Sequence, residues 1–457
     1  MTNKLLDCQY SHTQESAEIS KLSPIAEDMQ LIFSKIESDL PFVKDNSLQD
    51  LMSYTKNMEY PIHRWYQFKE GYSHKLVTTI LKDYAPPKNF PAILDPFCGS
   101  GTTLLVAQAN QLPAVGVEIN PFIAFLSRVK TGWFKINPEE LERVLKRVLK
   151  DNKSARFPLP ELTTFHNEEY FPNKNAYELV RLRDAIHRRK TTPEVKDALI
   201  LALVASLEDV SCLRKDGRLL RYIQRDVITP KEALFKRTMV ILEDLIAMEN
   251  CLSQDTKVLQ GDARQLDSLL SQNIVHNKFG LILYSPPYLN NFDYSEVYKC
   301  ELWLTGFINS YSDWKELRKK TFRSHPESRI PSTSYLKDTP SQREIHLLVE
   351  KAARCQDIGS YAQTRAPRVI RGYFDDVFLM LKEQMVRLVP GGYIVCVVGN
   401  SKHGNLYIPV DTLIAKIGQA LGLELVAIRI GKYRFSRNQK NQRLRESLVV
   451  FRKPELL

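Results

Sequence analysis

The sequence predicts an α/β protein built on a mostly parallel sheet. Three observations support this class: short apolar runs that end in acidic or turn-forming residues, helical patterns that follow these runs, and 43% hydrophobic residues in a chain of 457. An apolar run followed by a polar turn and an amphipathic segment is typical of a strand and its crossover helix. A chain of this length accommodates one large elaborated domain or two to three ordinary ones.

The first strand–loop–helix unit is expected near residue 92. Residues 92–103 predict a strand and a tight loop, residues 104–111 a helix, and residues 114–118 a second strand. This second strand ends in Glu118, and the first ends in Asp95. Such a spacing fits a nucleoside-binding half-sheet, in which a carboxylate at the tip of the second strand accepts hydrogen bonds from ribose hydroxyls.

The same rhythm returns in the second half of the chain. Strands are expected at 256–260, 279–284, 393–398, 423–430 and 447–451, and helices at 375–388 and 411–421. The strand at 279–284 has to stop there because two prolines follow Ser285, and proline cannot donate to a strand ladder. Residues 431–446 are expected to form a basic loop between the last two strands.

Two long stretches leave the α/β rhythm. Residues 122–255 predict a helical insertion, because their length exceeds that of any ordinary crossover. Residues 289–368 predict a second, mixed insertion. The expected organisation is therefore an N-terminal extension and three core segments, separated by these insertions: 1–58, then 59–121, 256–288 and 369–457.

Composition narrows the classes of function. A net charge of +11 favours a polyanionic partner, such as a nucleic acid. Seven cysteines without a CxxC pair or a Cys/His cluster argue against a disulfide framework and a structural zinc site. The first residues lack the features of a signal peptide, and the longest apolar run, 198–207, is too short to span a bilayer. We expect a cytoplasmic protein with no membrane association and no required metal.

Acidic residues follow three successive predicted strands: Asp95, Glu118 and Asp262. Gly99 and Gly101 would let a ligand approach the backbone closely, but their loop lacks the lysine and the third glycine of phosphate-binding motifs. An ammonium near Asp95, a ribose at Glu118 and an adenine amine at Asp262 together describe an adenosine that carries an amino acid. S-adenosylmethionine is such a molecule. Each acid alone is also an ordinary helix cap or turn former, and their recurrence at three strand ends favours the ligand.

The strand at 279–284 ends in a rigid corner, Ser285-Pro286-Pro287-Tyr288. Ligands of open α/β sheets bind at the carboxyl ends of the strands. A hydroxyl, a fixed carbonyl and an aromatic face at this position suit a flat ring that bears an amine. The alternative is an ordinary strand-terminating turn.

Residues 95–103 (DPFCGSGTT) and 285–288 (SPPY) together resemble the DNA amino-methyltransferases, which modify cytosine N4 or adenine N6, often within restriction–modification systems. The resemblance frames the α/β core, roughly half of the chain, and does not clearly cover the N-terminal extension or the insertions. It implies the class I S-adenosylmethionine-dependent methyltransferase fold, with a Rossmann-like, seven-stranded, mostly parallel sheet. It also implies S-adenosylmethionine as cofactor, duplex DNA as substrate and a cognate restriction endonuclease as a candidate partner.

The resemblance also assigns roles by position. The implied cofactor-binding residues are Tyr72, Ser73, Asp95, Pro96, Phe97, Gly99, Gly101, Thr102, Glu118, Ile119, Asp262 and Ala263. The implied catalytic residues are Ser285, Pro286, Pro287 and Tyr288. We expect the Ser285 hydroxyl and the Pro286 carbonyl to accept hydrogen bonds from the amine, and Tyr288 to stack on a base that has left the duplex. No Pro-Cys dipeptide occurs, which disfavours attack through cytosine C5, because that reaction requires a thiolate.

Serine at the first corner position favours cytosine N4 in this family, whereas aspartate or asparagine favours adenine N6. The alternatives are an adenine N6 enzyme, an RNA guanine-N2 methyltransferase and a non-catalytic DNA-binding subunit. DNA contact is expected from six basic residues near two aromatic residues: Lys432, Arg434, Arg437, Lys440, Arg443 and Arg445. The helical insertion is the candidate for target recognition, and the second insertion is a further candidate for DNA contact.

Overall fold

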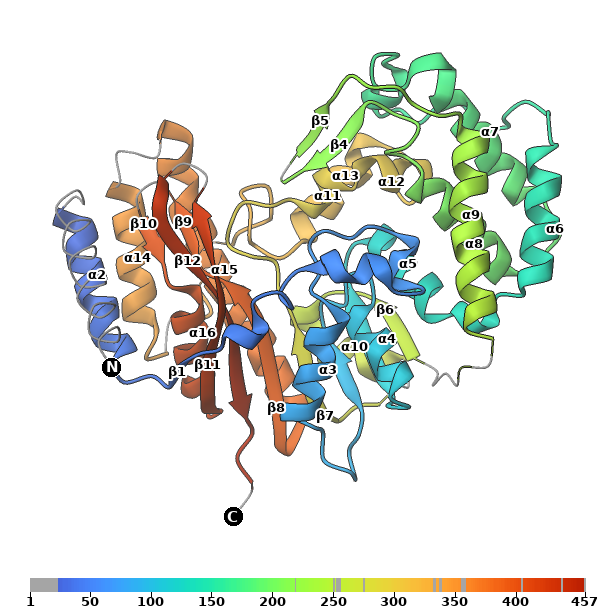
Figure 1. Cartoon of the computed structure of the whole chain (residues 1–457). Coiled ribbons are helices and arrows are strands. Elements are labelled where there is room, and N and C mark those ends of the chain that lie inside the picture. Colours follow the sequence, from blue (N-terminus) through green and yellow to red (C-terminus); the bar gives the residue numbers. More distant parts are fainter. Residues whose placement is uncertain are drawn as a thin grey trace, which may run out of the picture.

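The computed structural model describes residues 24–217, 219–249, 251, 256–273, 276–331, 334–336, 339–354, 359–403, 406–436 and 439–455. These residues form a central eight-stranded sheet in the order β1-β11-β12-β8-β7-β2-β3-β6 (Figure 1). The strands are β1 (Phe42–Lys44), β2 (Ile93–Asp95), β3 (Ala114–Glu118), β6 (Thr256–Gln260), β7 (Phe279–Tyr284), β8 (Leu388–Gly399), β11 (Glu424–Ser436) and β12 (Gln439–Arg452).

Strand direction confirms the expected fold class. All neighbouring pairs in this sheet are parallel except the two that involve β12, which runs antiparallel to both β8 and β11. The strands from β11 to β6 provide the mostly parallel, seven-stranded sheet of a class I methyltransferase. The eighth strand, β1, comes from the N-terminal extension and pairs with the edge strand β11.

Helices cover both faces of the sheet. On one face lie α10 (Leu266–Gln272), α14 (Gln342–Arg354), α15 (Gly359–Arg387), α16 (Val410–Ala420) and the N-terminal α2 (Pro24–Glu37). On the other face lie α3 (His74–Asp83) and α4 (Thr102–Ala109). Alternate residues of one strand serve the two faces: Leu281 and Leu283 point toward α3 and α4, and Ile282 points toward α15. Burial on both sides explains why β7 is apolar along its whole length.

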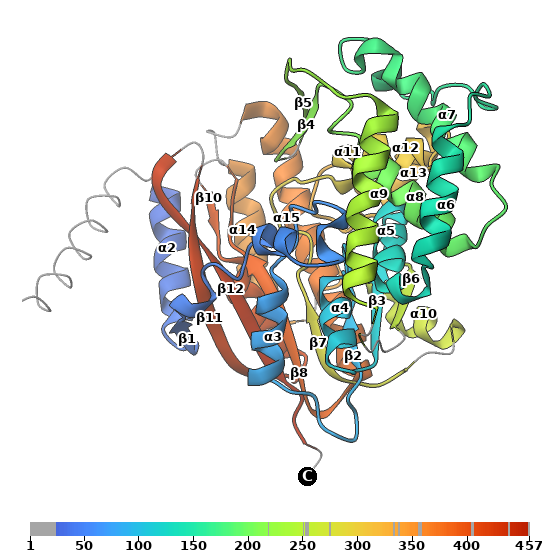
Figure 2. The same cartoon turned by 45° about the vertical axis from the view of Figure 1, so that its right-hand side comes forward.

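A helical lobe lies to one side of the sheet (Figures 1 and 2). It contains α6 (Pro138–Leu149), α7 (Asn175–His187), α8 (Pro193–Ala205), α9 (Pro230–Ala247) and a hairpin of β4 (Leu213–Asp216) and β5 (Leu219–Tyr222). The segment that follows β7 joins the same apolar core through α11 (Tyr294–Val297), α12 (Lys299–Leu304) and α13 (Tyr311–Lys320). The first predicted insertion and the start of the second therefore share one core, although they are separate in sequence. The rest of the second insertion, from Phe322 to Ala352, packs in the core of the sheet. Helix α5 (Pro121–Thr131) is an ordinary crossover helix that packs against β3 and β6.

The predicted loop at 431–446 is wrong. Strands β11 and β12 continue through most of this segment as a long hairpin, in which Lys432 pairs with Glu446 and Tyr433 with Arg445. Charged residues on opposite strands stabilise such a ladder, so a basic composition does not prevent strand formation. A short hairpin of β9 (Ser401–His403) and β10 (Leu406–Ile408) lies beside it. Among the described helices, none is both long and apolar enough to cross a membrane.

Candidate active site

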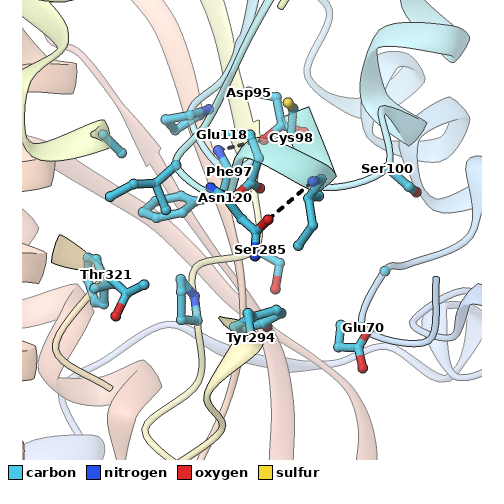
Figure 3. Close-up of a pocket in the computed structure, with 18 of the residues that line it drawn as sticks. Glu70, Asp95, Phe97, Cys98, Ser100, Glu118, Asn120, Ser285, Tyr294 and Thr321 are labelled. Atoms are coloured by element: carbon cyan, nitrogen blue, oxygen red, sulfur yellow. Dashed lines mark hydrogen bonds between the residues drawn. The ribbon is translucent and has the colours of Figure 1, made fainter. Parts of the chain in front are cut away.

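The carboxyl ends of the parallel strands meet at one hollow (Figure 3). The chain moves from β2 to β3 and β6 on one side, and then returns to β7 and β8 on the other. This reversal of strand order opens a crevice between β2 and β7, which is where open α/β sheets bind ligands. Together with the open space at its mouth, the hollow has an empty volume of about 980 Å³.

Asp95 closes β2 at the wall of this hollow and is only 2% exposed. Its carboxylate accepts hydrogen bonds from the Phe97 backbone N–H at 3.1 Å and the Tyr72 hydroxyl at 3.3 Å. Tyr72 also bonds the Thr103 hydroxyl at 2.6 Å. Burial raises the pKa of Asp95 to about 7, because desolvation disfavours the charged carboxylate. The group is therefore available to ionise beside a cation at neutral pH.

Glu118 closes β3 and lines the same hollow. Its Oε1 accepts a hydrogen bond from the Asn120 backbone N–H at 2.9 Å. Burial, with a smaller contribution from the negative charge of Asp95, raises the pKa of Glu118 to about 7. Asn120 in turn caps α5, so the strand, the acid and the helix are held as one unit.

The loop between β2 and α4 has the backbone shape that its glycines permit. Gly99 and Gly101 adopt φ values of +49° and +83°, which side chains with a Cβ rarely adopt. A Cβ at Gly101 would also lie 2.7 Å from Ser127 Oγ. The loop therefore brings bare backbone to the hollow beside Asp95.

Asp262 follows β6 and lines the hollow together with Gly261 and Ala263. Arg264 donates to its carboxylate at 2.6 and 2.9 Å, and also to Asp376 at 2.9 Å. Arg264 thus holds the Asp262 carboxylate in place and already donates to both of its oxygens. Its assignment to an adenine amine stays a prediction.

Some residues of the corner after β7 line the hollow, and Tyr288 contacts the sheet. Ser285 and Pro287 line the hollow. Tyr288 does not lie among the lining residues, and its hydroxyl donates to Glu446 on β12 at 2.9 Å. The Arg434 guanidinium lies over the Tyr288 ring, 5.2 Å from its centroid. Asp95 and Glu118 at two strand ends, and Ser285 of the corner, thus line one hollow.

Comparison with known proteins supports a methyltransferase. Residues 27–128 match a family model described as DNA methylase, of the N6/N4 type. Type II methyltransferase M.BsoBI of Geobacillus stearothermophilus is 25% identical to this chain, and the alignment covers 97% of the chain and 94% of that protein. Type II methyltransferase M.AvaI of Nostoc sp. is 24% identical, with coverage of 88% and 89%. These similarities support a DNA amino-methyltransferase family for this chain.

One solved structure, the rRNA methyltransferase aviRa from Streptomyces viridochromogenes, aligns with 83% of this chain and 85% of its own chain. The sequence identity is 12% and the TM-score is 0.27. A likeness at that level supports no conclusion about function or substrate.

The implied cofactor residues of the methyltransferase fall into two groups. Most of them line the hollow: Tyr72, Asp95, Pro96, Phe97, Gly99, Thr102, Glu118, Ile119, Asp262 and Ala263. Ser73 instead caps α3, where its hydroxyl accepts from the Lys75 backbone N–H at 3.1 Å, and Gly101 caps α4. Ser73 is fully buried, so its contribution to the site is the placement of Tyr72.

The basic residues expected to contact DNA have different surroundings. Lys432 forms an ion pair with Glu446 at 3.1 Å. The Arg445 guanidinium bonds Glu37 and the buried Asp411, and its side chain is only 14% exposed. Its expected contact with DNA stays a prediction. Arg443 lies on the surface. Arg437 and the side chain of Lys440 lie outside the described residues.

Sequence reasoning missed one wall of the methyltransferase site. This wall is formed by Tyr294, Thr321, Phe322, Ser324 and His325, all from the second insertion. The His325 ring bonds the hydroxyls of Thr321 and Ser328 at 2.9 and 3.1 Å. Only the position of Tyr294, shortly after the corner, could have indicated its place from sequence. The described residues contain no group of three or more potential ligands that could hold a metal ion.

Proposed function

We propose that this methyltransferase transfers a methyl group from S-adenosylmethionine to the exocyclic amine of a flipped DNA base, with cytosine N4 as the preferred acceptor. The observation that carries the proposal is one hollow that contains both the Asp95 and Glu118 carboxyls and the Ser285 hydroxyl. A methyl donor and an acceptor need to meet within one site, and this hollow provides both halves.

The residues present fit the cofactor. It combines an adenosine with a cationic amino acid, and the hollow offers two carboxyls whose pKa values lie near 7 and can ionise beside positive charge. Glu118, at the tip of the second strand, is placed to accept from ribose hydroxyls. When bound, S-adenosylmethionine supplies an electrophilic methyl group on a sulfonium centre. The bare backbone at Gly99 lets a ligand approach without a side chain in the way.

The corner supplies the acceptor half. An exocyclic amine is a weak nucleophile, because its lone pair is delocalised into the ring. Hydrogen bonds from the amine to the Ser285 hydroxyl and the Pro286 carbonyl would favour a pyramidal nitrogen and direct its lone pair toward the methyl group. The base has to leave the duplex first, because its amine is otherwise paired.

Several finer assignments belong to this proposal. Lys432, Arg434 and Arg443 are proposed DNA contacts, the helical lobe is the proposed reader of the target sequence, and a restriction endonuclease acting on the same site is the proposed partner. Serine at the first corner position favours cytosine over adenine. Mutation of the basic residues should weaken binding to all DNA sequences alike and reduce its dependence on salt.

The experiment measures methyl transfer from labelled S-adenosylmethionine to duplex DNA. The wild type should label DNA, and Ser285→Ala and Asp95→Ala should reduce kcat/KM at least a hundredfold while retaining the native circular dichroism spectrum. Transfer RNA serves as the competing substrate. Full transfer by both folded variants, or a preference for transfer RNA, would contradict the proposal.

A further inference from the structure

The two tyrosines near the corner have different surroundings. Tyr288, within the corner, contacts the sheet. Its hydroxyl donates to Glu446, and the Arg434 guanidinium lies over its ring. A Cβ at Gly399 would lie only 2.9 Å from the Tyr288 ring, so this strand packs closely on it. Arg434 and this strand thus fix the position of the Tyr288 ring, which stays partly exposed.

Tyr294 lies in the wall of the hollow that also contains Ser285. In the view of Figure 3 its ring lies beneath Ser285, on the side of the site away from Asp95 and Cys98. The Phe292 ring supports it, with centroids 4.6 Å apart. Within the described residues, the Tyr294 hydroxyl makes no hydrogen bond that would turn the ring elsewhere. Burial raises the pKa of Tyr294, so the phenol stays neutral.

The backbone that carries Tyr294 is fixed by a buried cluster. Asp293 caps α11, accepting from the Ser295 backbone N–H at 2.9 Å and the Ser295 hydroxyl at 2.6 Å. Arg318 donates to the same carboxylate at 2.7 Å. Trp314 Nε1 donates to the Ser295 carbonyl at 3.1 Å. Nothing in the proposed chemistry requires this cluster, and its effect is to hold Tyr294 in one position at the hollow.

We propose that Tyr294 supplies an aromatic face for the methyl-accepting base inside the hollow, next to the corner that Tyr288 anchors to the sheet. This inference rests on the proposed function, because it concerns the acceptor half of the same site. A base that leaves the duplex loses its stacking on neighbouring bases, and an aromatic side chain in the pocket replaces it. Loss of one base–aromatic stack weakens binding by roughly five- to 150-fold.

The test compares Tyr294→Phe, which keeps the ring, with Tyr294→Leu, which removes it. The control is Phe90→Leu, in the segment that enters β2 at the end away from the hollow, where the side chain is 42% exposed. Plasmid DNA that accepts label from the wild type is the substrate, at saturating S-adenosylmethionine. Calorimetric titration with the cofactor alone gives its Kd for each variant.

Tyr294→Leu should lower kcat/KM for DNA by roughly ten- to a hundredfold, as expected for a lost base stack. Tyr294→Phe and Phe90→Leu should stay within about threefold of the wild type, because both leave the Tyr294 ring or its aromatic equivalent in place. The cofactor Kd should change by no more than that in any of the three variants, because all of them leave Asp95 and Glu118 intact. Undiminished kcat/KM in Tyr294→Leu would overturn the inference. A raised cofactor Kd as the whole effect would also overturn it, and would place the ring against the methyl donor. A wild type that labels no DNA would instead contradict the proposed function.

Discussion

The pH dependence of cofactor binding follows from the two raised carboxyl pKa values. Asp95 and Glu118 lie in one hollow and both have pKa values raised to about 7 by burial. A cationic ligand binds their ionised forms better, so its affinity should increase from pH 6 to pH 8. A group with a pKa near 7 is roughly one-tenth ionised at pH 6 and nine-tenths at pH 8, which gives about tenfold per carboxyl. If both ionise on binding, the increase is on the order of a hundredfold.

The same shifts have the opposite effect on the free protein. Both folded-state pKa values lie above the ordinary values of 3.8 and 4.5. The folded state therefore binds more protons than the unfolded state in this range. The stability that these groups contribute is fully present below the ordinary values and is lost as the pH rises through about 7. Urea unfolding of the cofactor-free protein between pH 5 and 8 measures this loss.

Calorimetric titration at pH 6, 7 and 8, in buffers of different ionisation enthalpy, measures both affinity and proton release. Glu118→Gln removes one of the two carboxyls, so its affinity should vary only about tenfold over this range. The comparison of wild type and variant cancels any titration of the ligand itself. An affinity that is constant from pH 6 to 8 in the wild type would show that neither carboxyl ionises when the cofactor binds.

Two further predictions concern stability. Arg445→Met leaves the fully buried Asp411 without its cation. The free energy of unfolding, measured by urea denaturation, should fall by about 3–5 kcal/mol, while the DNA affinity of the folded protein stays unchanged. Lost DNA affinity at unchanged stability would instead support Arg445 as a DNA contact. Gly101→Ala places a Cβ at positive φ and against Ser127. The strain should lower the free energy of unfolding by about 1–2 kcal/mol and the melting temperature by several degrees, and cofactor binding should weaken. An unchanged melting temperature would contradict this strain.

The strand ends of the site could be predicted from sequence because the information there is local. Asp95, Glu118 and Ser285 each directly follow a short apolar run, and a glycine loop or two prolines mark where the strand ends. Parallel strands bring their carboxyl ends to one edge, so three separate segments can be placed together without knowledge of their contacts.

The remaining wall could not be predicted, because distant contacts determine it. Tyr294 reaches the hollow only because Arg318 and Trp314 fix its turn. The β11–β12 hairpin could not be recognised from sequence because its residues are highly charged. Lys432 is compatible with a strand because Glu446 lies opposite it. Pairing of β1 with β11 joins segments at opposite ends of the chain, and three residues carry too little pattern to indicate it.

Nucleoside analysis of methylated DNA tests whether the methyl group is transferred to cytosine N4. Purified protein, duplex DNA and S-adenosylmethionine are incubated, and the DNA is digested to nucleosides and examined by mass spectrometry. We expect N4-methyldeoxycytidine from the wild type and its loss in Ser285→Ala. N6-methyldeoxyadenosine would contradict the assignment of the base while preserving the chemistry. The absence of any methylated nucleoside, or the appearance of 5-methyldeoxycytidine, would contradict transfer to an exocyclic amine.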